Sequence, residues 1–212
     1  MRISDSKRKL NIEITKKDLT IKNEMLIKRL AIASAIMFSW LLIWALILKL
    51  GSEVLLVRNY TNLKDMTLEE RLMWDLIPFN YRGTDYWKMR QMIDTLLNCF
   101  VFAPLGFLLC YIFEKKNILR DALICLSFSV FVETMQLLTM LGNPSTEDLI
   151  TNVVGCFIGH IVYRLFFGRL SMQKNTIFLR IVCIIFVVSV AFSLVTTAMA
   201  VDTIIEIITK TM

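Results

Sequence analysis

Carboxylate and amide side chains interrupt otherwise apolar sequence between Asn98 and Gly159, and these residues have the most potential for chemistry. A carboxylate in hydrocarbon costs roughly 2.5–3.5 kcal/mol on insertion scales, so a carboxylate in such a stretch needs a partner or a purpose. Its possible purposes are ligand binding, general-base catalysis and proton transport. The candidate binding residues are Asn98, Glu133, Gln136, Asp148 and Asn152, and the candidate catalytic residues among them are Glu133 and Asp148.

Helical spacing predicts that these side chains form one cluster. Glu133 and Gln136 are i,i+3 neighbours on one helix face. Counting about 1.5 Å per residue from the expected helix ends places Asn98, Gln136 and Asn152 at similar depths, with Glu133 one turn deeper. Asp148 lies at the mouth of the cluster. A second interpretation stays open for Asn98 and Asn152, because amides in membrane helices often serve only as interhelical hydrogen bonds.

Prolines and glycines predict how the helices around this cluster are shaped. Pro104 lies inside a helical run and removes one backbone donor, which favours a kink. Glycines at i+4 spacing allow another helix to approach closely. Pro78 ends a helix that a capping box at Thr67–Glu70 begins, and Ser145 or Thr146 is placed to cap the helix that carries Asp148. The candidate structural residues are Pro78, Pro104, Gly106, Gly155 and Gly159.

The elements that must position these residues are membrane-spanning helices. The 212 residues are 56% hydrophobic, and the mean hydropathy is +0.61, which is too apolar for an ordinary soluble domain. About 20 apolar residues span a bilayer. Five runs reach this length, at residues 30–48, 95–113, 122–141, 149–167 and 181–201. We therefore expect an all-α, polytopic membrane helical bundle that forms a single domain over residues 30–201. An arm at 1–29, a loop at 51–94 and a tail at 202–212 complete the chain.

Lysine and arginine predict the orientation of the bundle. Basic residues cluster in the arm, in the loop between spans two and three, and in the loop between spans four and five. The loop Gly142–Asp148 contains none. Because basic loops stay in the cytoplasm, we expect the N-terminus inside and the C-terminus outside, with the polar cluster toward the outer face. The interfacial aromatic residues in loop 51–94 are compatible either with a lid over the cluster or with simple anchoring.

Cysteine spacing argues against a metal site. The five cysteines lie inside the expected spans without CxxC pairing, and His160 is the only histidine. We expect no metal and no cofactor, and we interpret His160 as a packed, hydrogen-bonded residue. The net charge of +6 and the pI of about 9.1 reflect the orientation signal, so nucleic acid is not an expected partner.

Taken together, four motifs resemble the VanZ-like family of bacterial membrane proteins. They are Leu76-Ile-Pro-Phe79, Asn98 followed by Phe102-x-Pro-Leu-Gly-Phe107, Glu133-x-x-Gln136, and Asp148-Leu-x-x-Asn152-x-x-Gly155-x-x-x-Gly159. The resemblance covers about residues 40–167. The family often has an acid or arginine shortly before the Asp-Leu pair, whereas this chain has Asn143-Pro-Ser-Thr-Glu147. The resemblance implies a multi-pass protein of the cell membrane, found mainly in Gram-positive bacteria and tied to teicoplanin-type glycopeptide resistance, without a settled catalytic mechanism.

Three functions remain as hypotheses. The first is a non-enzymatic, outward-facing polar pocket that binds a lipid, a lipid-linked envelope precursor or a lipoglycopeptide. The second is an intramembrane enzyme that acts on a lipid-linked substrate with Glu133 or Asp148 as general base, but the sequence offers no Ser-His or Cys-His set and no HExxH motif. The third is a small proton-coupled transporter. The sequence favours the first, with the lipid bilayer as the general partner and the oligomeric state open.

Overall fold

The computed structural model describes residues 2–48, 67, 77–81, 84–113, 117–139 and 145–211. Within these ranges the regular structure is helical. The elements are α1 (Arg2–Leu42), its π-helical continuation η1 (Ile43–Leu48), α4 (Asp85–Ile112), α5 (Ile118–Thr139), α6 (Thr146–Val162), its π-helical continuation η2 (Tyr163–Phe167) and α7 (Met172–Thr211). The expectation of an all-α protein is confirmed.

Five helices of the described residues are long and apolar enough to cross a membrane, as the sequence predicts. They cover Glu13–Ala45, Gln91–Ile112, Ile118–Leu138, Thr146–Phe167 and Met172–Ala198. All five begin earlier than the hydropathy runs, because helices continue into polar residues that the runs exclude. The first difference is the largest: the basic arm at 1–29 is the N-terminal part of α1 and continues without a break into the first span.

The surface of the bundle suits lipid. Large apolar side chains of α7 point outward, and Ile184, Val188 and Phe192 are 63%, 63% and 64% exposed. Monomeric soluble proteins rarely expose contiguous apolar patches of this kind. The side chains of α7 therefore match a hydrocarbon solvent.

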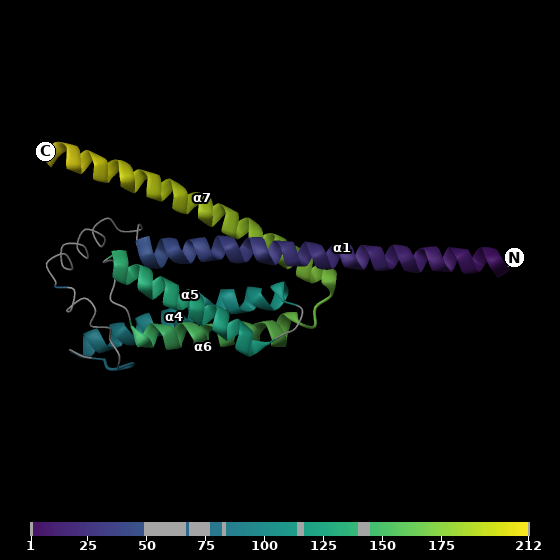
Figure 1. Cartoon of the computed structure of the whole chain (residues 1–212), viewed down its shortest axis with the longest axis horizontal. Coiled ribbons are helices and arrows are strands. Elements are labelled where there is room, and N and C mark those ends of the chain that lie inside the picture. The colour runs from purple at the N-terminus through teal and green to yellow at the C-terminus, as the bar shows by residue number, and fades with distance from the viewer. Residues whose placement is uncertain are drawn as a thin grey trace.

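The helices are arranged around α4 and α6, which run parallel to each other (Figure 1). We name the two ends of the bundle by one residue each. At the Ser145 end α4 and α6 begin and α5 ends; at the Ile112 end α4 ends and α5 and α7 begin. The helix α5 packs against α6 in the opposite direction, α1 packs along α4, and α7 packs along α1. The N-terminal part of α1 extends beyond the Ile112 end (Figure 1).

Glycine allows α4 and α6 to pack backbone against backbone. A Cβ atom at any of three positions would overlap the main chain of the facing helix. These contacts are Gly106 against Cys156, Gly155 against Cys99, and Gly159 against Ala103. The close approach expected at the i+4 glycine pair thus involves α4 as the second helix, and α4 continues through Pro104 without interruption.

Two tryptophans join α1 to α7. The Nε1–H of Trp40 donates to Ser193 Oγ at 3.1 Å, and that of Trp44 donates to Thr197 Oγ1 at 3.0 Å. Both pairs are 153 residues apart, so the two helices run parallel in one register. Burying these indole N–H groups against hydroxyls satisfies donors that lipid would leave unpaired.

Most of the expected helix before Pro78 lies outside the described residues. Most of loop 51–94 that precedes α4 lies outside them too, so the expectation of a lid over the polar cluster stays a prediction. The described segment 77–81 forms a turn at Pro78, and Phe79 follows with φ at 60°. A bulky residue rarely adopts this left-handed backbone, so something must hold it. The N–H of Phe79 donates to Glu147 Oε2 at 3.0 Å, which ties this turn to the first turn of α6.

We predict that Gly159→Ala destabilises the helix bundle by about 1–3 kcal/mol or more, because the added methyl group meets the Ala103 backbone and not a movable side chain. The measurement is thermal unfolding of the detergent-purified protein. Gly168→Ala is the matched control, since its nearest contact would be Arg164 O at 3.5 Å. Equal melting temperatures for the two variants would contradict the close packing of α4 and α6.

Candidate functional site

A stripe of buried polar and thiol side chains runs along one face of α5. Asp121, Cys125, Ser129 and Glu133 follow each other at intervals of four residues, and they are 0%, 0%, 0% and 2% exposed. Residues four apart lie one above the other on a helix. The stripe faces α6 along almost the whole length of α5 and defines what we call the polar seam.

The polar seam is joined to α6 by hydrogen bonds at three levels. At the Ser145 end, Glu133 Oε2 accepts from the Ser145 N–H at 3.1 Å. In the middle, Asn152 Nδ2 donates to Ser129 Oγ at 2.8 Å. At the Ile112 end, Asp121 Oδ2 lies 3.1 Å from His160 Nδ1. In a low-dielectric interior, these bonds are what make burial of the polar groups tolerable.

Three carboxylates gather at the Ser145 end, where α6 begins, and we call them the carboxylate cluster: Glu133, Glu147 and Asp148. Ser145 caps α6 by accepting the N–H of Glu147 on its side chain at 3.1 Å, and the acids that follow suit the positive end of the helix dipole. Asn98 Nδ2 donates to Asp148 Oδ1 at 2.6 Å. This bond links α4 to α6 at the same level.

Glu147 accepts hydrogen bonds from the segment 77–81 and from α4. Its Oε1 accepts from the Tyr81 hydroxyl at 3.1 Å and from the Thr95 hydroxyl. Burial raises the pKa of Tyr81, the hydrogen bond with Thr95 lowers it, and Glu147 raises it further. The phenol is thus neutral at physiological pH and keeps the proton that it donates to the carboxylate.

The predicted site residues are brought together only in part, and their expected depths are wrong. Asn98 meets Asp148 and not Asn152, which lies one turn further into α6 and pairs with Ser129. Glu133 is therefore nearer the Ser145 end than Asn152, not deeper. The counts failed because relative depth depends on the register in which α4 packs against α6, and this register places Asn98 level with Asp148.

Two amides of the expected set, Gln136 and Asn152, lie at different levels of the bundle. Gln136 is half-buried on α5, one turn beyond Glu133 toward the Ser145 end. Asn152 is 3% exposed, and its Oδ1 has no hydrogen-bond partner among the described residues. This oxygen can therefore accept a hydrogen bond in the middle of the polar seam.

A second cluster at the Ile112 end was missed by the sequence analysis. His160 Nδ1 lies 3.2 Å from Cys110 Sγ and 3.1 Å from Asp121 Oδ2. Arg120 binds the other oxygen of that carboxylate, Oδ1, through Nη2 at 2.7 Å and Nε at 3.0 Å. The cluster draws on three helices, so spacing along the chain gives no signal for it, although the i+4 stripe on α5 marks Asp121 as inward-facing.

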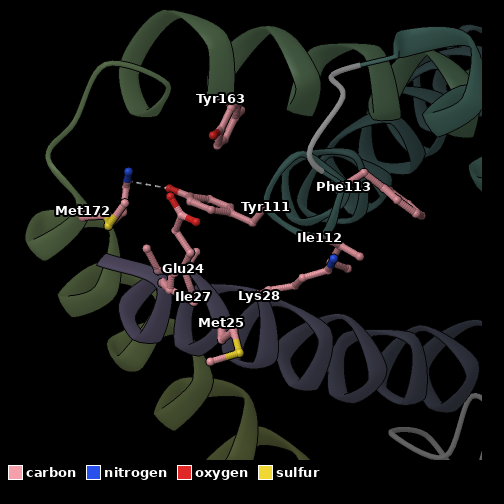
Figure 2. A pocket seen from close by; sticks show the side chains of 11 residues that line it. Glu24, Met25, Ile27, Lys28, Tyr111, Ile112, Phe113, Tyr163 and Met172 are labelled. Carbon is pink, nitrogen blue, oxygen red and sulfur yellow. Dashed lines mark hydrogen bonds between the residues drawn. The ribbon is translucent and has the colours of Figure 1, made fainter. Parts of the chain in front are cut away.

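A cavity of about 550 Å³ lies at the same end, between α1, α4, η2 and α7 (Figure 2). Tyr111 and Tyr163 project into it from α4 and η2, and α1 contributes Glu24 and Lys28 (Figure 2). The hydroxyl of Tyr111 donates to Asn175 Oδ1 at 2.8 Å. The cavity therefore has both charged and aromatic walls.

The comparisons with known proteins identify the family. Residues 35–168 match the family described as VanZ/LLP1. The chain belongs to the VanZ/LLP1 family. It is 32% identical over 133 residues to Protein VanZ of Enterococcus faecium, an alignment that covers 63% of this chain and 73% of that relative. No solved structure matches the chain.

The family region coincides with the helices that build both clusters. The match at 35–168 covers α4, α5 and α6 completely and ends at the start of α7. The resemblance to the VanZ-like family that the sequence motifs carry is confirmed. Five candidate spans in a VanZ-family chain indicate a multi-pass membrane protein.

We predict that Glu133→Gln is tolerated, because the amide oxygen still accepts the Ser145 N–H, whereas Glu133→Ala lowers the free energy of unfolding by about 1–3 kcal/mol, the cost of an unpaired buried donor. The measurement is thermal unfolding together with hydrogen exchange over the first turn of α6. Thr134→Ala is the control, since that exposed hydroxyl donates to Val130 O of its own helix. Destabilisation of the Gln and Ala variants to the same extent would contradict a role as acceptor.

Proposed function

We propose that this VanZ-family protein lies in a bacterial cell membrane with the Ser145 end outward, and that this end binds teicoplanin-type glycopeptides without catalysis and so lowers their action. The observation that carries the proposal is the carboxylate cluster around the start of α6, to which α5 contributes Glu133. Asn98 of α4 and the turn at Phe79 donate hydrogen bonds to the other two carboxylates. The orientation follows from charge: the Ile112 end carries Arg120, Arg164, Arg169 and Lys174 in and beside its helix ends.

The chemistry of the Ser145 end favours a ligand rich in hydrogen-bond donors. Three carboxylates in one place attract amines and hydroxyls and repel phosphate groups. A lipid-linked precursor that carries a pyrophosphate would meet like charge here. A glycopeptide, with amine and hydroxyl groups, would meet acceptors.

Exposed apolar side chains beside the carboxylate cluster suit an acyl chain. Leu96, Leu97 and Phe100 flank Asn98 on α4, and they are 59%, 53% and 66% exposed. A ligand with a polar body and a fatty chain would therefore contact acceptors and apolar surface at once. This combination supports a lipoglycopeptide over a purely polar glycopeptide.

The hydrogen bonds of Glu133 favour binding over catalysis. Its Oε2 accepts the N–H of the residue that caps α6, so Glu133 holds the helix start in place. A general base must come within reach of a substrate proton, and Glu133 is 2% exposed whereas Glu147 and Asp148 are half-buried. We therefore assign Glu133 a positioning role and assign ligand contact to Asp148 and Glu147.

Resistance assays test the proposed function. Deletion of the gene is expected to sensitise cells to teicoplanin, and wild-type protein to restore protection. Asp148→Asn and Glu147→Gln are expected to weaken teicoplanin binding by the purified protein about tenfold, the equivalent of one charge-assisted hydrogen bond, and to lower protection accordingly. Asp85→Asn is the matched control, because this exposed acid at the start of α4 pairs with Lys88 of the same helix.

Two results would overturn the proposal or its mechanism. Unchanged susceptibility of the deletion strain would contradict a role in glycopeptide resistance. Loss of protection in Glu133→Gln at normal protein levels would favour the enzymatic hypothesis, because this variant keeps the acceptor and loses the base.

Cysteine labelling tests the orientation. A membrane-impermeant maleimide is expected to label Thr84→Cys at the Ser145 end in intact cells and to label Gln173→Cys at the Ile112 end only after permeabilisation. Both positions are exposed at helix starts, so accessibility differs only by the side of the membrane. Wild-type protein reports the background from the five native cysteines. The reverse labelling pattern would place the carboxylate cluster in the cytoplasm.

A further inference from the structure

We propose that Cys110, Asp121 and His160 form a zinc site at the Ile112 end, separate from the carboxylate cluster. The three side chains are 0%, 0% and 1% exposed, and their ligand atoms all lie within 4.8 Å of one another. They come from the last turn of α4, the first turn of α5 and the last turn of α6. An ion held by all three would tie these helix ends together.

The two separations from His160 are close to those around a tetrahedral ion, and the ligand atoms of Cys110 and Asp121 lie within 4.8 Å of each other. Ligand atoms at zinc distances of about 2.0–2.3 Å lie roughly 3.3–3.6 Å from each other. The observed separations of 3.2 Å to Cys110 Sγ and 3.1 Å to Asp121 Oδ2 from the shared His160 Nδ1 need an expansion of only a few tenths of an ångström. The remaining position of the tetrahedron stays open for water or another ligand.

The Asp121 carboxylate and the Cys110 thiol both approach the same nitrogen of His160. Nδ1 of His160 carries either a proton or a lone pair, so it cannot satisfy a carboxylate acceptor and a thiol donor at the same time. His160 Nε2 is buried without a hydrogen-bond partner among the described residues, so the imidazole is fixed from its Nδ1 side only. A cation between the three ligand atoms satisfies sulfur, nitrogen and oxygen together.

Arg120 supplies the support that a carboxylate ligand requires. Its guanidinium occupies Oδ1 of Asp121 with two N–H groups and leaves Oδ2 directed at His160. The guanidinium also lies over the Phe113 ring, 3.7 Å from the ring centroid. Outer-shell partners of this kind orient metal ligands and tune their basicity.

The mixture of donors selects the class of metal. Thiolate, imidazole and carboxylate together suit zinc, whereas magnesium and calcium prefer oxygen alone, and copper(I) prefers sulfur without a carboxylate. The cavity of about 550 Å³ lies at the same end of the bundle, where Tyr111, adjacent to Cys110, and Tyr163, one turn after His160, line it (Figure 2).

Metal analysis of the full-length, tag-free protein in detergent tests the site. We expect about one zinc per wild-type chain after equilibration with zinc and dialysis, and loss of this zinc in Cys110→Ser and His160→Gln. Cys183→Ser is the matched control, since this half-buried cysteine lies on α7 away from the cluster and is expected to keep the metal. Arg120→Gln is expected to weaken zinc binding about 10- to 100-fold while leaving the three ligands in place.

Cobalt substitution provides a readout that does not depend on the folding of the variants. Cobalt bound to the wild-type chain is expected to show a thiolate-to-cobalt charge-transfer band in the near ultraviolet. Bound cobalt without that band overturns the site, and so does zinc content no higher than in the Cys110→Ser, Asp121→Asn, His160→Gln triple variant. Neither measurement involves glycopeptides, so its outcome is independent of the proposed function.

Discussion

The rest of the structure depends on the backbone contact between α4 and α6. Three glycines remove the side chains that would separate the helices, and the two axes then share one register. Asn98 and Asp148 are 50 residues apart, and so are Cys110 and His160. The same helix pair thus sets the polar contact at each end of the bundle. Without a hydrophobic force between helices in lipid, close packing of this kind is the main source of association energy, so a single methyl group in the contact has a large effect.

The polar seam fixes which way α5 packs on this pair. Each buried donor or acceptor on α5 has a counterpart at one level of α6, from Glu133 at one end through Ser129 to Asp121 at the other. A shift by one residue rotates the stripe of α5 out of contact and leaves several polar groups unpaired in a low-dielectric interior, each at about 1–3 kcal/mol. Individual interhelical bonds contribute little, about 0.6 kcal/mol on average. Their combined effect is on specificity, because alternative packings lose all of them together.

How far the sequence predicts this arrangement depends on whether a feature lies within one helix or between helices. The number of spans, the Ser145 cap and the helix faces of Glu133 and Asp148 follow from periodicity within a single segment. Relative depth does not, because it requires the packing register between helices, and the register of α4 and α6 pairs residues 50 apart in the chain. The cluster at Cys110 is beyond any spacing rule, since its members meet only after α4, α5 and α6 have packed. Within the sequence of α5, the i+4 stripe that begins at Asp121 indicates that this side chain is buried, but it does not indicate which residues Asp121 contacts.

Rigid helices separate the two ends while holding both in place. Asn98 and Cys110 are about 18 Å apart along α4, a distance over which side-chain substitutions usually act independently. A metal ion at the Ile112 end would therefore change the carboxylate cluster only by moving whole helices, and the close backbone contact at the glycines opposes such movement.

The distribution of charge also distinguishes the two ends of the bundle. Acids surround the start of α6, where the helix dipole favours them, and basic residues surround its end. The same asymmetry supports both the proposed orientation in a membrane and the proposed binding of donor-rich ligands at the Ser145 end. Both proposals thus rest on one charge asymmetry along the bundle.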